Sequence, residues 1–381
     1  MIYKNFQDMK LSALGMGAMR LPVLNGDDAT IETATVQEMV DYAMENGVNY
    51  YDTAWGYHGG NSEIAMGLAL SKHPREQFYL ADKFPGYDLS NMPKVKEIFE
   101  KQLKKCGVNY FDFYLFHNVC EMNIDAYLNP SYGIYDYLLE QKKKGRIRHL
   151  GFSVHGSYDV MKRFLDAYGK DMEFCQIQLN YVDWAFQNAK AKVELLKEWN
   201  IPIWVMEPLR GGKLANLSEA HAGQLKALRP DETIPAWAFR YLQSIPEVTV
   251  VLSGMSNLEQ LSANIKTYET DQPLNQTEID TLFSIAEGML NDTLPCTACR
   301  YCVSHCPRGL DIHTLLALYN EHSFTGGGVL APMALMAIPE AKHPSACGGC
   351  RSCEKVCDSL HRQKDVLPVE AVAAVKRSAR R

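Results

Sequence analysis

Residues 48–52 read Val-Asn-Tyr-Tyr-Asp, a short run of β-branched and aromatic residues that ends in a charged side chain. Similar runs recur, and longer amphipathic segments such as 33–46, 95–105, 158–168 and 188–199 lie between them. Short apolar runs are typical of strands and the amphipathic segments of helices. Eight strands with intervening helices predict an α/β fold, a closed (β/α)8 barrel rather than a doubly wound sheet. The expected strands are 11–18, 48–52, 78–83, 112–117, 149–153, 174–180, 203–207 and 248–253.

Polar residues stand at the carboxyl ends of four consecutive expected strands: Asp52, Lys83, His117 and Ser153. In a (β/α)8 barrel these ends converge on one face, where catalytic groups are placed. No Gly-x-Gly-x-x-Gly follows an expected strand, so the fingerprint of a dinucleotide-binding Rossmann fold is absent from the sequence. A nicotinamide cofactor would therefore bind by another route.

The chain has 381 residues, enough for one barrel of about 250 residues and a module of about 100. Its net charge of −6 gives no case for nucleic acid or an anionic membrane as partner. No apolar run of about 18 residues occurs, and the first residues lack a signal peptide's apolar segment, so we expect a cytoplasmic protein. The βα pattern stops near Leu294, which predicts a barrel over 1–288 and a second domain over 289–381.

Eight of the 11 cysteines crowd into two runs in the second domain. Without a secretion signal they indicate metal rather than disulfides. Both runs read C-x2-C-x2-C-x3-C, and Pro307 follows the first, as in bacterial two-cluster ferredoxins. Asp358 stands where the second run would have that proline. The first run is Cys296, Cys299, Cys302 and Cys306; the second is Cys347, Cys350, Cys353 and Cys357.

In this spacing three cysteines of one run bind a cubane together with the last cysteine of the other run. One [4Fe–4S] cluster would thus be held by Cys296, Cys299, Cys302 and Cys357, and the second by Cys347, Cys350, Cys353 and Cys306. Structural zinc is the alternative, but zinc sites of four cysteines usually pair two Cys-x-x-Cys elements and need no third cysteine in either. The sequence therefore predicts an α-rich, ferredoxin-like domain with two clusters.

Several stretches of the first domain resemble the aldo-keto reductases. Residues 51–63 contain Asp52-Thr53-Ala54 and then Tyr57, Lys83 closes the third expected strand, and His117 closes the fourth. Further similar stretches are 151–153, 175–180, 207–212 and 253–264. The resemblance covers about residues 5–270 and implies a TIM barrel; with the cysteine runs, the whole chain resembles the ferredoxin-fused branch of the family.

The resemblance implies a catalytic role for four residues. Hydride addition to a carbonyl builds negative charge on oxygen, which must be protonated as it forms. Tyr57 would be the proton donor, Lys83 the cation that stabilises its phenolate, and Asp52 the partner that keeps Lys83 charged. His117 would donate a hydrogen bond to the substrate carbonyl. Each residue alone has a simpler explanation, as packing, capping or surface charge, but their joint placement on successive strand ends favours catalysis.

The resemblance also implies the cofactor contacts. Ser153 and Gln176 would hold the carboxamide of a nicotinamide, the backbone at Leu209 and Gly211 would cover the pyrophosphate, and Gln260 and Asn264 would contact the adenosine end. Gly254 and Gln260 stand where many members carry a Lys and an Arg that bind a 2′-phosphate, and Met206 stands where an aromatic often stacks on the nicotinamide. The cofactor is therefore expected to be NADP(H) or NAD(H).

These features predict an iron–sulfur oxidoreductase that interconverts a small carbonyl compound and an alcohol. The clusters would relay electrons to or from a ferredoxin or flavodoxin partner. Two alternatives stay open: the same reductase with purely structural clusters, and an electron-transfer protein with a non-catalytic barrel.

Overall fold

The computed structural model describes residues 1–290, 293–294, 296 and 301–356. The chain divides into two compact units, one over residues 1–285 and the other from Ala286 onward. This division and the expected boundary after residue 288 both fall inside helix α12 (Gln276–Met289).

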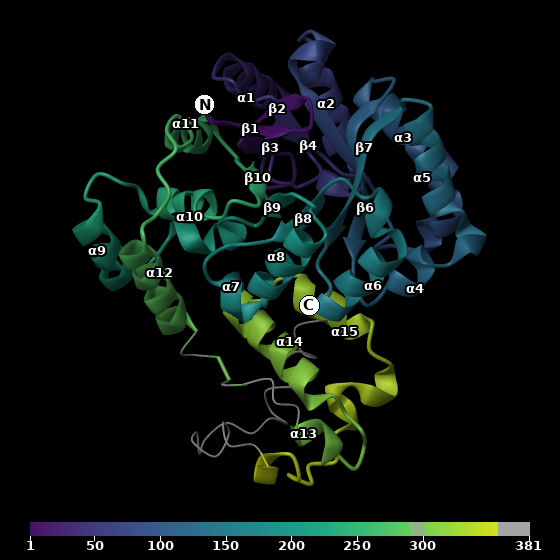
Figure 1. Ribbon diagram of the computed structural model, residues 1–381, viewed down its shortest axis with the longest axis vertical. Helices are drawn as coiled ribbons and strands as arrows, with labels where there is room; N and C mark the ends of the chain where they lie inside the picture. Colours follow the sequence, from purple (N-terminus) through teal and green to yellow (C-terminus); the bar gives the residue numbers. More distant parts are fainter. Residues whose placement is uncertain (291–292, 295, 297–300, 357–381) are drawn as a thin grey trace. The chain divides into compact units, whose positions relative to one another are not determined.

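The first unit is a closed barrel of eight parallel strands in the order β10-β3-β4-β5-β6-β7-β8-β9 (Figure 1). The predicted (β/α)8 barrel is therefore confirmed, and each expected strand has a counterpart in it. The strands are β3 (Leu14–Gly17), β4 (Tyr50–Asp52), β5 (Tyr79–Phe84), β6 (Phe111–Val119), β7 (Ile147–Val154), β8 (Cys175–Gln178), β9 (Ile203–Met206) and β10 (Val248–Gly254).

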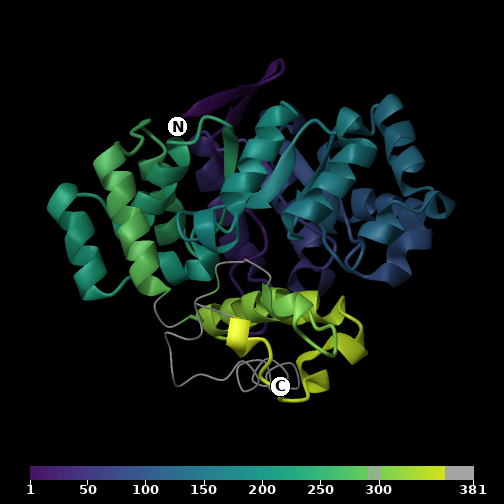
Figure 2. The same ribbon diagram turned by 60° about the horizontal axis from the view of Figure 1, so that its bottom comes forward.

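The expected first strand, 11–18, is wrong in its extent because the chain breaks at Ala13. Strand β2 (Met9–Ser12) pairs antiparallel with β1 (Tyr3–Phe6), and only β3 enters the barrel (Figure 2, purple). The backbone N–H of Ser12 donates to the side chain of Asn49 at 2.8 Å, and the Ser12 hydroxyl donates to the Leu14 carbonyl at 2.7 Å. These two bonds, one to the distant Asn49 and one to Leu14, hold the turn between β2 and β3.

The β1–β2 hairpin contributes to the core that fills the barrel. Phe6 packs edge-on against Trp204 of β9, with ring centroids 5.1 Å apart, and Leu11 belongs to the same buried cluster as Phe113 and Val250. Because the hairpin leads directly into β3, it lies at the amino ends of the strands. The interior of the barrel is thus filled by packed side chains, and catalytic groups are expected at the carboxyl ends of the strands.

Helices cover the outside of the strands, as the two directions of Figures 1 and 2 show. Their apolar residues recur at helical spacing; in α6, for example, Val160, Met161, Phe164 and Leu165 are buried. The helices of the first unit are α1 (Thr33–Glu45), α2 (Ser62–Leu70), α3 (Val95–Cys106), α4 (Ile124–Tyr127), α5 (Ile134–Lys143), α6 (Tyr158–Tyr168), α7 (Asp183–Phe186), α8 (Ala189–Glu198), α9 (Glu219–Leu228), α10 (Ile234–Gln243), α11 (Leu258–Thr267) and the start of α12.

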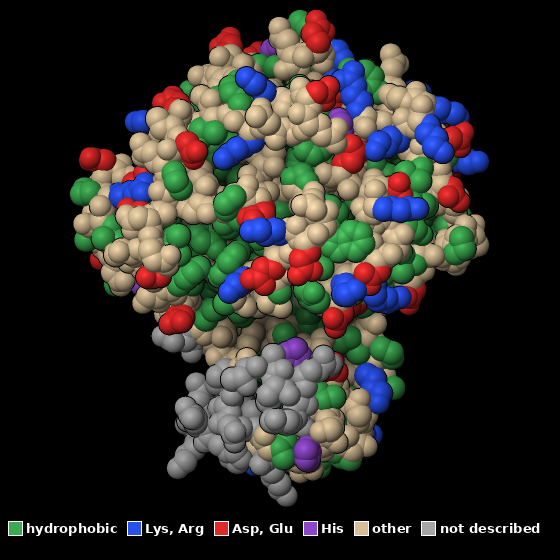
Figure 3. Space-filling model, viewed as in Figure 1, with side chains coloured by type: hydrophobic (Ala, Val, Ile, Leu, Met, Phe, Trp, Pro, Cys, Tyr) green, Lys and Arg blue, Asp and Glu red, His purple; other side chains and the backbone are tan. Residues whose placement is uncertain are grey.

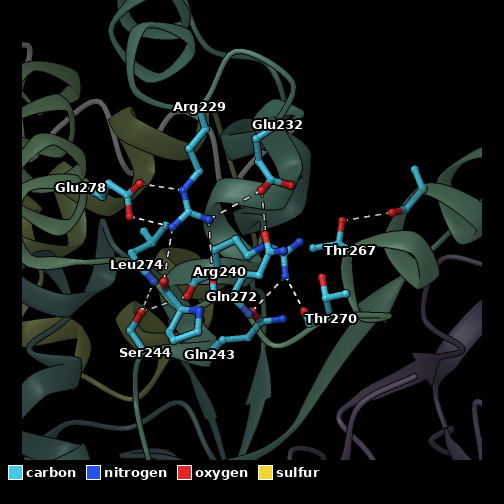
Figure 4. Close-up of polar contacts among 12 residues, drawn as sticks. Arg229, Glu232, Arg240, Gln243, Ser244, Thr267, Thr270, Gln272, Leu274 and Glu278 are labelled. Atoms are coloured by element: carbon cyan, nitrogen blue, oxygen red, sulfur yellow. Dashed lines mark hydrogen bonds and ion pairs between the residues drawn. The ribbon is translucent and has the colours of Figure 1, made fainter.

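A polar network fastens the beginning of α12 to the barrel helices (Figure 4). Arg229, directly after α9, donates to both carboxylate oxygens of Glu278 at 2.6 and 2.7 Å. Arg240 of α10 donates to the Thr270 carbonyl at 2.6 Å and to Glu232 at 3.3 Å. Such bidentate and charge-assisted bonds are stronger than neutral ones. The last helix of this unit is therefore held by charge as well as by packing.

The described part of the second unit is helical. It contains α13 (Tyr301–Ser304), α14 (Ile312–Thr325), α15 (Leu330–Met336) and the 3-10 turns η7 (Glu340–Lys342), η8 (Pro344–Ala346) and η9 (Glu354–Val356). Its core includes Leu310, Leu315 and Leu335. Asn320 of α14 exchanges two hydrogen bonds of 2.8 Å with the backbone of Leu294. These bonds tie Leu294 to α14.

On the face shown in Figure 3, Lys and Arg side chains are interspersed with Asp and Glu. Among the described residues of that face, neither charge forms an extended area. Within the part of the chain that the structure describes, no helix has both the length and the apolar character needed to span a bilayer.

Candidate active site

Lys83 is the centre of the site. It lies near the carboxyl end of β5, and its side chain is fully buried. The ammonium donates to Asp52 Oδ1 at 2.5 Å and to the Thr53 carbonyl at 2.7 Å, both at the end of the adjacent strand β4. Burial alone lowers the pKa of Lys83, but the Asp52 carboxylate, and after it a Tyr57 phenolate, outweigh the burial and raise the pKa to about 12. Lys83 is therefore a cation at neutral pH.

Tyr57 lies next to this cation. It begins the turn η1 (Tyr57–Gly60) after β4, and its hydroxyl is 3.5 Å from the Lys83 ammonium. Burial raises the pKa of Tyr57, and the Lys83 charge opposes that rise. The phenol is therefore protonated at neutral pH, and the nearby cation is placed to stabilise a phenolate.

The turn that carries Tyr57 is fixed by its neighbour His58. This side chain is buried and its backbone has a φ of 53°, an unusual value for a residue other than glycine. Its Nε2 accepts from the Leu21 N–H at 3.1 Å, so Nδ1 carries the proton that is donated to the Asp28 carbonyl at 2.7 Å. The loop after β3 thus holds the Tyr57 turn in place.

His117 of β6 completes the set. Its ring is perpendicular to that of Tyr57, at 82° and 6.1 Å between centroids. Burial, and then the charge of Lys83, hold the pKa of His117 well below its usual range. The imidazole is therefore neutral, and the Tyr127 hydroxyl fixes its backbone by donating to the His117 carbonyl at 2.8 Å. All four residues of the predicted catalytic set lie at the ends of β4, β5 and β6.

Ser153 and Gln176, expected at the carboxamide, are register partners on β7 and β8. The Ser153 hydroxyl accepts from the Asn118 N–H at 2.7 Å. Gln176 is buried, and within the described part of the chain its Oε1 has no hydrogen-bond partner. A buried acceptor of this kind fits the NH2 group of a carboxamide.

Leu209 and Gly211, expected at the pyrophosphate, belong to the loop that follows β9. Arg210 between them is buried and its Nε donates to Asp183 at 3.0 Å. Gly211 is exposed and has a φ of 67°. The arginine therefore fastens the loop from beneath and leaves the glycine backbone accessible.

Gln260 and Asn264, expected at the adenosine end, lie on α11 and bond to their own surroundings. The exposed Gln260 accepts from the Ser256 N–H at 2.9 Å, and the buried Asn264 donates to the Ser253 hydroxyl at 3.1 Å. These contacts order the end of β10 and the start of α11. They bring neither residue to the catalytic set.

Two further residues near these sites were missed by the sequence analysis. A Cβ added to Gly254 would lie 3.1 Å from the Arg20 Cβ, and one added to Gly211 would lie 3.4 Å from Arg20 Nη2. Arg20 thus extends between the two predicted phosphate-side segments. The second residue is Tyr87, whose ring is 5.3 Å from that of His117 at 87°. Arg20 soon after a strand end was a usable signal; Tyr87 after Pro85-Gly86 resembled an ordinary turn.

The second unit has a cavity of about 230 Å³. It is lined by four of the eight expected iron ligands: Cys306, Cys347, Cys350 and Cys353. Among the described residues, no three cysteine, histidine or carboxylate side chains are gathered closely enough to hold a metal ion. Cys302 is buried and Cys296 exposed, while Cys299 and Cys357 lie outside the described residues.

Known proteins share the barrel unit. The NADH-specific methylglyoxal reductase of Escherichia coli (strain K12) is 26% identical over 305 residues, covering 68% of this chain and 90% of that protein. L-galactose dehydrogenase of Arabidopsis thaliana is 25% identical over 317 residues, covering 75% and 94%. The holo form of an aldo-keto reductase from Bacillus halodurans has the same fold, with a TM-score of 0.59 at 24% identity, covering 74% and 95%.

The sequence model of the aldo/keto reductase family matches residues 13–287, which is most of the chain. The protein therefore belongs to the aldo/keto reductase family and is an oxidoreductase.

Proposed function

We propose that this protein interconverts a carbonyl compound and an alcohol, with a nicotinamide as hydride carrier and Tyr57 as proton donor. The observation that carries the proposal is the buried ammonium of Lys83, which lies between the Asp52 carboxylate and the Tyr57 hydroxyl. A phenol is a poor acid at neutral pH unless a cation stabilises its anion. A buried lysine beside a tyrosine meets that need.

Each residue has a distinct task in the reduction. Tyr57 gives its proton to the oxygen on which negative charge develops, and Lys83 stabilises the phenolate that is left. Asp52 keeps the Lys83 ammonium charged and in position. His117, neutral because of its burial, donates a hydrogen bond that orients the carbonyl.

The side chains available at the other strand ends suit a nicotinamide cofactor, which would supply the hydride. Ser153 and Gln176 would hold its carboxamide, the backbone at Leu209 and Gly211 would cover the pyrophosphate, and Gln260 and Asn264 would contact the adenosine. The uncharged Gly254 and Gln260 leave NADP(H) and NAD(H) both open, and the E. coli relative is named as specific for NADH.

The test is oxidation of NADH and NADPH by the purified protein, followed by absorbance with a panel of small aldehydes and ketones. Methylglyoxal belongs in the panel because it is the substrate in the name of the E. coli relative. Wild type is expected to reduce members of the panel, and Lys83→Met is expected to lose most of that activity. Equal rates for the two proteins would contradict the proposal.

We further propose that the domain over residues 289–381 holds two [4Fe–4S] clusters, which relay electrons between the barrel and a ferredoxin or flavodoxin. The spacing of the two cysteine runs supports this. Cys306, Cys347, Cys350 and Cys353, the crossed set expected for one cluster, line one cavity, but no three cysteine, histidine or carboxylate side chains among the described residues are close enough together to hold a metal ion, so the cysteine spacing alone carries this proposal. Thiolates are the usual ligands of such clusters.

Iron and sulfide content of anaerobically purified protein tests this second proposal, with about eight of each expected per chain. Stoichiometric zinc would contradict it. Bleaching of the cluster absorption by reduced nicotinamide would favour the relay. Clusters that stay oxidised, in a protein that loses thermal stability when they are removed, would favour a structural role. Clusters without any carbonyl reduction would favour an electron-transfer protein with a non-catalytic barrel.

A further inference from the structure

Two tyrosines, not one, contact the His117 ring. Tyr57 contacts it at 6.1 Å and 82°, and Tyr87 contacts it at 5.3 Å and 87°. Tyr87 follows strand β5 through Pro85 and Gly86, so it comes from the same strand end as Lys83. The catalytic set therefore has a second phenol beside it to which the proposed reaction gives no task.

The Tyr87 hydroxyl occupies the space next to Gly56 that a side chain at that position would fill. A Cβ added to Gly56 would lie 2.3 Å from the Tyr87 hydroxyl oxygen, a separation that atoms cannot adopt. The backbone of Gly56 has a φ of −94°, which any residue can adopt, so a larger residue there would displace the Tyr87 hydroxyl rather than strain the backbone. Gly56 directly precedes Tyr57, and the Tyr87 hydroxyl is thus seated on the turn that carries the proton donor.

The Tyr87 hydroxyl makes no hydrogen bond with the residues that the structure describes, and its side chain is only half-buried. Burial, and then repulsion from a Tyr57 phenolate, raise the pKa of Tyr87 to about 12, so at neutral pH Tyr87 is a neutral phenol that can donate or accept a hydrogen bond. A polar group on a partly enclosed surface gains most from a ligand that supplies the missing partner.

We propose that Tyr87 selects substrates that carry a second oxygen on the carbon next to the carbonyl. The reacting oxygen is taken by Tyr57 and His117, and the neighbouring oxygen is bound by the Tyr87 hydroxyl. The substrate class is thus 2-hydroxycarbonyl and 1,2-dicarbonyl compounds. This inference rests on the proposed carbonyl reduction, and it assigns recognition, not proton transfer, to Tyr87.

Two pairs of compounds of matched size test the inference. Hydroxyacetone and butan-2-one differ in a hydroxyl against a methyl group, and so do glycolaldehyde and propanal. Wild type is expected to prefer the oxygenated member of each pair. Tyr87→Phe keeps the ring and removes the hydroxyl, so it should lower kcat/KM for the oxygenated members about tenfold, as expected for one lost hydrogen bond. The values for butan-2-one and propanal should stay within about twofold.

The matched control is Tyr79→Phe, which removes a hydroxyl from the other end of β5, where the ring packs against Phe113. It should leave all four values unchanged. A second route to the same site is Gly56→Ala, which should displace the Tyr87 hydroxyl and reduce the preference for oxygenated substrates. Adding Tyr87→Phe to Gly56→Ala removes the 2.3 Å contact with the hydroxyl but leaves the ring carbon Cζ 3.3 Å from the added Cβ, so the double variant should still lack the preference for oxygenated substrates.

The outcomes separate this inference from the reaction on which it rests. If Tyr87→Phe reduces propanal and glycolaldehyde in the wild-type ratio, Tyr87 does not select the second oxygen and the inference is overturned while the reductase stands. If wild type binds nicotinamide but reduces no carbonyl compound, the proposed reaction fails, and the role of Tyr87 fails with it.

Discussion

The Lys83 ammonium lies 2.5 Å from the Asp52 carboxylate and 3.5 Å from the Tyr57 hydroxyl. Burial raises the pKa of Asp52, and the charge of Lys83 opposes that rise. One buried cation thus faces a carboxyl group that it helps to keep ionised and a phenol that becomes an anion only when it gives up its proton. The 2.5 Å contact with Asp52 keeps the buried Lys83 charged. The 3.5 Å contact with Tyr57 places the same ammonium where it can stabilise a Tyr57 phenolate. This division of one charge between two partners is the basis of the predictions on catalysis and stability.

Tyr57→Phe should lower kcat for carbonyl reduction by about 10²- to 10⁴-fold, because the general acid is lost while the ring stays. The dissociation constant of NADH or NADPH, measured by fluorescence titration, should change little. Tyr79→Phe on β5 serves as the control for loss of a phenol. A Tyr57→Phe enzyme with near wild-type kcat would mean that Tyr57 is a packing residue.

Lys83→Met should lower the free energy of unfolding by about 3–5 kcal/mol, because it leaves the buried Asp52 carboxylate without a countercharge. The double variant Lys83→Met with Asp52→Asn removes both charges and should recover much of that loss. Urea denaturation measures both differences.

The contribution of Lys83 depends on pH. Its pKa is raised from 10.5 to about 12 in the folded protein, so the stability it adds is complete below pH 10.5 and lost as the pH rises through 12. The difference in free energy of unfolding between wild type and the Lys83→Met, Asp52→Asn double variant should therefore become smaller as the pH rises from 10.5 to 12. A difference that is constant over this range would argue against a charged Lys83.

His117 should not titrate near neutral pH. Burial and the charge of Lys83 hold its pKa well below the ordinary 6.5, so its ring stays neutral as the pH falls through that value. Carbon-13 NMR of labelled histidine rings, with free histidine as an internal reference, measures this; His117→Asn identifies the signal. Titration of that signal together with the reference would contradict the neutral hydrogen-bond donor.

The strand ends of the site could be predicted from the sequence, because a barrel brings them together whatever the loops do. Asp52, Lys83 and His117 each follow an apolar run, and the barrel rule then places them on one face. Tyr87 could not be found in this way. Its position depends on the space next to Gly56, about 30 residues earlier in the chain. The two residues meet only because β4 and β5 pair in the barrel.

Local hydrogen bonds explain the errors in strand boundaries. The expected strand 174–180 stops at Gln178 because the Asn180 side chain accepts from the N–H groups of Val182 and Asp183, which starts α7. Such side-chain bonds compete with the ladder and have little signature in apolar periodicity. For Arg20 the sequence offered only its position soon after an expected strand, because its place between Gly211 and Gly254 depends on two distant segments.

Arg20→Gln should weaken binding of NADH and NADPH about tenfold, because the guanidinium is the cation that extends between Gly211 and Gly254 and can pair with cofactor phosphates. The loss should shrink at high salt, where charge pairs are screened. Arg163→Gln is the control, since Arg163 is an exposed arginine on α6 that pairs with Asp125. Equal affinity of the Arg20→Gln and Arg163→Gln variants would show that Arg20 does not touch the cofactor.

Cys353→Ala should lower the iron content from about eight to about four per chain, because Cys353 is expected to hold only one of the two clusters. Cys353 shares a cavity with Cys306, Cys347 and Cys350, whereas Cys120 is buried in the barrel unit, so Cys120→Ala is the matched control and should keep all its iron. Nicotinamide-dependent carbonyl reduction should survive in both variants, since hydride and proton transfer need only the barrel residues. Activity with a reduced ferredoxin or dye as donor should fall in Cys353→Ala alone.

If both activities of Cys353→Ala fall together and its melting temperature drops, the cluster supports the fold rather than carrying electrons. If Cys353→Ala retains all its iron, Cys353 is not a ligand and the crossed assignment is wrong.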